Sequence, residues 1–133
     1  YVASAHGNLA EVAMRLGDVP AAAGHQRSCL ELAVALGSPA LVAFSLIVAA
    51  RIAGWRDDWT TAVALHAKAE EQLEEIGLVL YEDDRKEIEA LLDRAREQLG
   101  DEDFRAARSQ GLEVTLSDAV QLADQVLATA EGA

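Results

Sequence analysis

The sequence predicts an all-α fold built from helical hairpins, with about seven helices in a single domain. Along the 133 residues, apolar side chains recur at intervals of three or four positions, the spacing that lines up one face of an α-helix. Most of these runs end near a glycine and follow an aspartate, serine or threonine, residues that end and begin helices. The apolar and polar alternation that indicates strands is not seen.

The first two expected helices are joined by a tight turn at Gly17 and Asp18. Glycine readily takes the left-handed backbone angles that end a helix, and aspartate caps the next helix. The first helix, over residues 8–16, carries a stripe formed by Leu9, Val12, Ala13 and Leu16. The second helix ends at Gly37, and its apolar face comprises Ala22, His25, Cys29, Leu32, Ala33 and Leu36.

The third expected helix is apolar on nearly all of its faces. It starts at Ser38 and Pro39, a cap residue followed by a proline at the first helical position, and it extends to about Ala53. Proline is well tolerated at that position because the first N–H groups of a helix have no intrahelical partner. A helix that is apolar all round must be covered on more than one side.

The fourth expected helix is capped by Asp57 or Asp58 and closed by Gly77, before a short linker over residues 78–80. An aspartate at the cap accepts a hydrogen bond from a backbone N–H of the first turn. The apolar face of this helix comprises Trp59, Ala62, Val63, His66, Ala69, Leu73 and Ile76.

Three further helices are expected after the linker. The fifth stops at Gly100, and its apolar face comprises Ile88, Leu91, Leu92, Ala95 and Leu99. Asp101 opens a short sixth helix that ends at Gly111. Thr115, with Asp118 three residues later, is typical of the cap of a last helix that continues to about Ala130.

The chain also resembles itself. Residues 8–17 match residues 45–54 at an offset of 37, and residues 18–37 match residues 58–77 at an offset of 40. A loop about three residues longer, around positions 55–57, explains the change of offset. Since one hairpin cannot bury its own apolar face, such units stack. We therefore expect one helical repeat domain over 1–133, with two elongated hairpins over 8–77 and capping helices over 81–130.

The first half resembles the tetratricopeptide repeat. The resemblance is carried by Asn8-Leu9-Ala10, Gly17-Asp18, Ala22 and Cys29-Leu30, which stand where that repeat has its leucine, its small residue, its glycine-acid turn and its paired small residues. The resemblance implies a fragment of an α-solenoid.

The second half is similar to the C-terminal region of large bacterial LuxR-type regulators, which are signal-transduction ATPases. The similarity is carried by residues 65–70, 76–77, 99–107, Gly111 and residues 115–120. It implies a sensing or scaffolding arm of a transcription regulator, with the ATPase module preceding it in a longer protein. A start at Tyr1 without a methionine also favours an excised segment.

Composition excludes several function classes. With 23 acidic and 11 basic residues, the formal net charge of -12 repels the phosphate backbone, so direct nucleic-acid contact is not expected. The longest apolar stretch, over residues 39–50, is shorter than the roughly 20 residues that span a bilayer. A single cysteine, Cys29, cannot form an internal disulfide and suits the reducing cytoplasm.

No catalytic, cofactor or metal site is predicted, so the chain is not expected to be an enzyme. No glycine-rich loop ends in Gly-Lys-Ser or Gly-Lys-Thr, as a triphosphate site requires. His66 and Glu70 have the spacing of two metal ligands, but they make only half of a zinc site, and a buried core histidine is the alternative. His25 has the same interpretation, and Cys29 is expected to be a small buried thiol.

Candidate partner-binding residues follow from the resemblance to tetratricopeptide repeats, whose first helices line a concave face. In this chain the corresponding positions are Glu11, Met14, Arg15, Val48 and Arg51, and Trp55 in the longer loop is a candidate contact anchor. Because the third helix is apolar on that face, we expect the C-terminal helices, an upstream repeat or a second copy of the chain to cover it.

Three functions follow from these patterns. The leading hypothesis is a non-catalytic regulatory arm that binds protein, either the ATPase region of its own parent chain or another protein, with a homodimer as a further option. The alternatives are a helical domain that senses a small apolar molecule, and a stand-alone scaffold or adaptor.

Overall fold

The computed structural model describes residues 17–80 and 82–132, and within these ranges it is all-helical, as predicted. Its five helices are α2 (Val19–Leu36), α3 (Pro39–Trp55), α4 (Trp59–Glu75), α5 (Glu82–Glu113) and α6 (Leu116–Glu131). The helix expected over residues 8–16 lies outside the described residues. In the described part of the chain, no helix is both long enough and apolar enough to cross a membrane.

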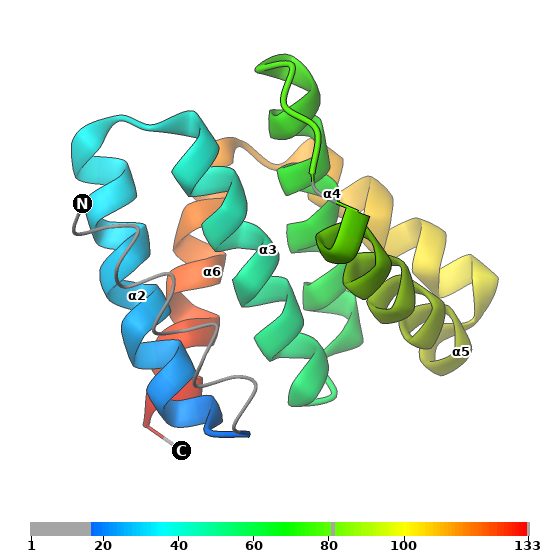
Figure 1. Cartoon of the computed structure of the whole chain (residues 1–133). Coiled ribbons are helices and arrows are strands. Elements are labelled where there is room, and N and C mark those ends of the chain that lie inside the picture. The colour runs from blue at the N-terminus through cyan, green and yellow to red at the C-terminus, as the bar shows by residue number, and fades with distance from the viewer. Residues whose placement is uncertain (1–16, 81, 133) are drawn as a thin grey trace.

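Three helices stand side by side, and the other two cover them (Figure 1). Helices α2, α3 and α4 form an antiparallel row, α6 packs against α2 and α3, and α5 packs mainly against α4. Helix α6 is antiparallel to α2, because Arg27, in the first half of α2, contacts Glu131 at the end of α6. The result is a two-layer helical body in which α3 is central.

The turns between the helices repeat at equal intervals. Positions 17, 37, 57 and 77 all have positive φ angles, and three of these residues are glycines. The residues that follow the first three, Asp18, Ser38 and Asp58, each accept a hydrogen bond from a backbone N–H three residues later, at 3.1, 3.3 and 3.3 Å. One cap design, recurring every 20 residues, therefore sets the length of α2, α3 and α4.

This regularity corrects one part of the repeat alignment. The match of Gly17 with Gly54 is wrong, because Gly54 lies inside α3, which continues to Trp55. The left-handed turn is instead made by Asp57, whose φ is 60°. An aspartate tolerates this conformation better than most residues with a side chain, so sequence alone does not mark the position. The structural interval is 20 residues throughout.

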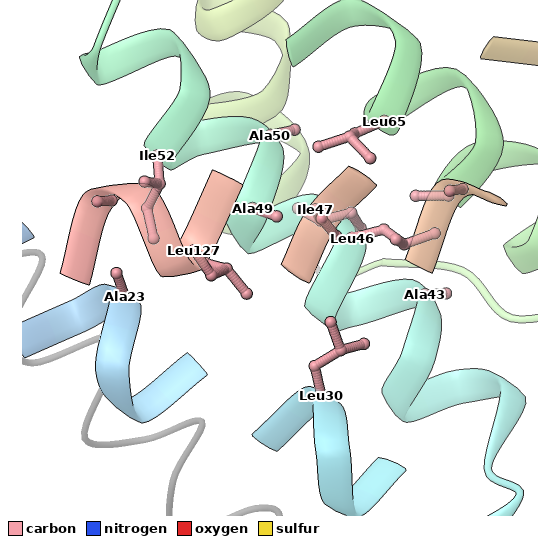
Figure 2. Close-up of a cluster of buried hydrophobic side chains, with 14 of the residues drawn as sticks. Ala23, Leu30, Ala43, Leu46, Ile47, Ala49, Ala50, Ile52, Leu65 and Leu127 are labelled. Carbon is pink, nitrogen blue, oxygen red and sulfur yellow. The ribbon is translucent and has the colours of Figure 1, made fainter. Parts of the chain in front are cut away.

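Helix α3 is buried on most of its surface, as its composition predicts. Its buried residues are Val42, Ala43, Ser45, Leu46, Ile47, Ala49, Ala50, Ile52, Ala53 and Gly54. Figure 2 shows part of the cluster that they form with other helices, including Leu30 of α2, Leu65 of α4 and Leu127 of α6. Helices α4 and α2 flank α3, α6 covers a further side, and α5 contacts it only slightly.

The ends of α2 and α4 differ from the prediction. Leu36 was assigned to the buried face of its helix, but it is 55% exposed, and Ile76 is also exposed. The buried face of α2 includes Ala22, Cys29 and Ala33, as predicted, and also Ala23, Gln26 and Leu30. The reason is that α2 packs between α3 and α6, and these two neighbours determine which side is covered.

Helix α5 changes direction at Gly100, where φ is 80° and ψ is 162°. The predicted break between the fifth and sixth helices is therefore present: two helical segments meet at a kink whose central residue is not helical. The predicted end at Gly111 is wrong, since the helix continues to Glu113. Gly111 serves packing, because a Cβ atom there would lie 2.7 Å from the Cα atom of Ala64 in α4.

Two glycine substitutions separate packing from helix propensity. Gly111→Ala is expected to lower the free energy of unfolding by about 1–3 kcal/mol, because the added methyl group overlaps the α4 backbone. In α2, the methyl group of Gly24→Ala meets only the flexible side chain of Glu131, at 3.5 Å. This substitution is expected to raise the free energy of unfolding by about 0.4–1 kcal/mol. Urea denaturation measures both, and equal effects of the two substitutions would contradict this packing role.

The turn at Asp57 offers a second test. Asp57→Val is expected to lower the free energy of unfolding by about 1–2 kcal/mol, because a β-branched residue is strained at positive φ. Asp57→Gly is expected to stay within about 0.5 kcal/mol of the unchanged chain, since glycine takes this conformation freely. If the valine and glycine variants unfold at the same urea concentration, the left-handed turn is not the constraint that we describe.

Candidate functional site

The residues predicted to bind a partner do not form one open surface in the described structure. Glu11, Met14 and Arg15 lie outside the described residues. Val48 and Arg51 line a small hollow of about 100 Å³ between α3 and the start of α5. Trp55, at the end of α3, is 45% exposed.

The hollow beside Val48 and Arg51 is closed mainly by the chain's own α5. The Arg51 Nη2 atom lies 3.1 Å from the Glu87 Oε2 atom of α5. The other residues that line the hollow are Phe44, Ile47, Leu80, Asp84 and Ile88. Among the three predicted residues that the structure describes, Trp55 therefore remains the most accessible to a partner.

A larger groove lies between α2 and α6 and reaches the start of α3. It consists of two adjoining hollows of about 520 and 400 Å³, which share Val34 and Val120. The first is lined by Leu30, Glu31, Val34, Val120, Gln121, Asp124 and Gln125. The second is lined by Ala33, Val34, Gly37, Ser38, Pro39, Val42, Gln72, Leu116, Ser117 and Val120. We call these two hollows the α2–α6 groove.

The α2–α6 groove has an apolar centre and a polar, acidic edge. Val34, which is 52% exposed, and Val120 lie where the two hollows meet. Glu31 of α2 and Asp124 of α6 supply carboxylates, and no lysine or arginine lines either hollow. Such a surface offers apolar contact in the middle and attracts positive charge at its edge.

A salt-bridge cluster fixes the position of α6 on α2. The Arg27 Nε atom donates a hydrogen bond to the Asp124 Oδ1 atom at 3.0 Å, and its Nη1 atom lies 3.6 Å from the Glu131 Oε2 atom. The hydrogen bond to Asp124 and the charge of that carboxylate raise the pKa of Arg27. Arg27 thereby aligns the two helices that form the groove.

Sequence reasoning missed this groove because its two walls come from distant parts of the chain. Neither α2 nor α6 contains a motif that predicts their contact. The available signal was Val34, an apolar residue that lies outside the predicted apolar stripe of its helix. An exposed apolar side chain becomes informative only when others surround it, and that requires the tertiary structure.

A second polar cluster joins α4 to the later part of α5. The buried His66 Nδ1 atom lies 3.8 Å from the Glu70 Oε2 atom, and the Arg108 Nη2 atom lies 3.6 Å from the Glu70 Oε1 atom. The buried Lys68 Nζ atom donates to the Glu71 Oε1 atom at 2.8 Å and to the Leu112 carbonyl oxygen at 3.2 Å. These contacts supplement the apolar packing of α5.

His66 is a buried core histidine, as one of its two interpretations predicted. Burial is the main cause that lowers its pKa; Arg108 lowers the pKa further, whereas Glu70 raises it. Within the described ranges, no group of three histidine, cysteine, aspartate or glutamate side chains is arranged to hold a metal ion.

The other two residues considered for site chemistry differ from each other. Cys29 is buried, as predicted, and its Sγ atom lies 3.9 Å from the Ser45 Oγ atom, which donates to the Leu41 carbonyl oxygen at 2.8 Å. His25 is only half-buried, so the prediction of a core position is wrong. It lies beside the buried face of α2, not on it.

Comparisons with known proteins found no matching family model, no matching curated protein and no matching solved structure. The resemblance to LuxR-type regulators therefore stays a prediction from the sequence.

His66 is expected to make stability depend on pH. Its pKa in the folded chain is lower than the ordinary value of 6.5, so folding favours the neutral ring. This contribution is complete above pH 6.5, and it is lost as the pH falls through the lowered pKa. Urea denaturation between pH 8 and pH 5 should therefore show stability falling toward pH 5, and His66→Gln should reduce that fall.

Glu70→Gln is the matched variant, because it keeps the size of the side chain and removes the charge that favours protonated His66. The loss of stability toward pH 5 should then become steeper. If His66→Gln leaves the pH dependence of the free energy of unfolding unchanged, His66 is not its source.

Proposed function

We propose that this chain is a protein-interaction module, the regulatory arm of a larger bacterial transcription regulator, and that it binds protein through the α2–α6 groove. The observation that carries the proposal is the exposed Val34, which lies beside the part-buried Val120 where two open hollows adjoin. Contiguous exposed apolar surface surrounded by polar residues is typical of interaction sites.

The composition of the groove supports a reversible protein contact. The interface of a non-permanent complex has an apolar centre and a polar rim. Here Val34 and Val120 supply the centre above the buried Leu30, and glutamines and carboxylates supply the rim. The Arg27 contacts with α6 hold the two walls in place before a partner arrives, which lowers the entropic cost of binding.

The resemblance to LuxR-type regulators supplies the context of the proposal. In this interpretation, α2, α3 and α4 belong to tetratricopeptide-like hairpins of an α-solenoid, and α5 and α6 cap them. Terminal units of repeat proteins are commonly atypical, because they must cover the last apolar face. The partner would be the ATPase region of the parent chain or another protein, and the charge of -12 disfavours nucleic acid.

Small-molecule sensing is the second candidate function, because the size of the hollows favours it. Volumes of about 520 and 400 Å³ lie in the range of small-ligand pockets, roughly 300–1,000 Å³. A ligand pocket, however, encloses most of its ligand, whereas both hollows are open grooves on the surface. We therefore favour a protein partner.

Site-specific photo-crosslinking in the cells that make the protein tests this proposal. A benzoylphenylalanine replacing Val34 is expected to give ultraviolet-dependent adducts with protein, because Val34 lies at the centre of the groove. The same photoreactive residue replacing Glu102, an exposed residue of α5, is the control and should give fewer adducts. Mass spectrometry of the adducts identifies the partner.

Two results would contradict the proposal. The first is equal labelling from positions 34 and 102, which would mean that the groove has no preferred partner. The second is a small molecule that stays bound to the isolated chain in native mass spectrometry and blocks adduct formation at position 34. That result would establish the sensing function instead.

A further inference from the structure

The shape and the charge of the α2–α6 groove point to one kind of occupant, and we infer that it is a positively charged amphipathic helix of a partner protein. This inference rests on the proposed function and specifies the partner's chemistry.

The walls of the groove have the geometry that receives a helix. Helices α2 and α6 run antiparallel, with Arg27 contacting Asp124 and Glu131 toward one end and Val34 near Val120 toward the other. The furrow between two adjacent helices is a surface on which a third helix packs. The lining residues of α6 extend from Leu116 to Gln125, about 14 Å at 1.5 Å per residue, or between two and three helical turns.

The centre of the groove specifies the apolar face of that helix. Val34 and Val120 join the two hollows, Leu30 lines one of them, and Leu116 lines the other. A ligand helix with apolar side chains at positions i, i+4 and i+7 places them in a row of similar length. Because the centre of the groove is apolar, the ligand helix needs no polar side chain on the face that packs against it.

The acidic edges of the α2–α6 groove specify the charge of the ligand helix. Helices α2 and α6 together contain four acidic residues, namely Glu31, Asp118, Asp124 and Glu131, and their single lysine or arginine is Arg27. Arg27 is already engaged with two of these acids. Lysine or arginine residues flanking the apolar face of a ligand helix would lie near Glu31, which borders the same hollow as the Arg27-paired Asp124. A second copy of this chain would instead bring acidic edges together.

A synthetic helical peptide of 15 residues tests the inference on the whole chain. Its leucines stand at i, i+4, i+7 and i+11, lysines flank them, and a second peptide has glutamates in place of the lysines. We expect the lysine peptide to bind, with amide NMR shifts concentrated at Leu30, Val34, Val120 and Gln121. Its affinity should fall as salt is raised from 50 to 200 mM, because the charges at the edge are screened.

Two substitutions and one control make the test specific. Val34→Asp should weaken binding of the lysine peptide at least about tenfold, as expected for a central contact. Glu31→Lys should weaken the lysine peptide about threefold or more and strengthen the glutamate peptide. Glu102→Lys makes the same charge change on exposed α5 and should alter neither affinity more than about twofold. Circular dichroism checks that each variant keeps its helices.

Three outcomes would overturn the inference: equal binding of both peptides, NMR shifts away from the groove, or a dimer of the chain that covers Val34. If the lysine peptide fails while position 34 still crosslinks to a protein, the charged-helix inference falls and the proposed function stands. If position 34 crosslinks to no protein, the proposed function falls and this inference falls with it.

Discussion

The need to bury α3 on all of its faces determines how the other helices are arranged. A helix without a polar side cannot lie on a surface, so it requires neighbours in more than one direction. Helices α2 and α4 flank it in the row, α6 covers it from one side, and α5 contributes a smaller contact. Because α3 takes its cover from both ends of the described chain, the hairpins and the C-terminal helices form one body.

Polar contacts supplement the apolar packing by which the covering helices are held. Small residues such as Ala43, Ala49 and Ala123 make up much of the core between these helices. Arg27 in α2 and Lys68 in α4 each bind a specific oxygen on a covering helix, Asp124 Oδ1 in one case and the Leu112 carbonyl in the other. These contacts give each covering helix at least one specific polar partner in addition to its apolar packing.

The sequence predicted the helices better than the contacts between them. Local signals sufficed for the cap at Thr115, which accepts from the Asp118 N–H at 3.1 Å, and for the break at Gly100, because caps and turns depend on neighbouring residues. Of the two aspartates predicted as the cap of α4, Asp58 is the cap and Asp57 makes the left-handed turn. Gly111 was misread, since a packing glycine resembles a helix end. The α2–α6 groove was missed because no local pattern reports which helices meet.

The wall of the groove that α6 provides has a consequence for protein synthesis. Val34 is made early and Val120 late, with α3, α4 and α5 translated between them. A nascent or prematurely truncated chain that lacks α6 has only one wall of the groove, and it also lacks part of the cover of α3. The surface that we assign to a partner therefore exists only on molecules that the ribosome has translated through α6, so incomplete products cannot compete for that partner.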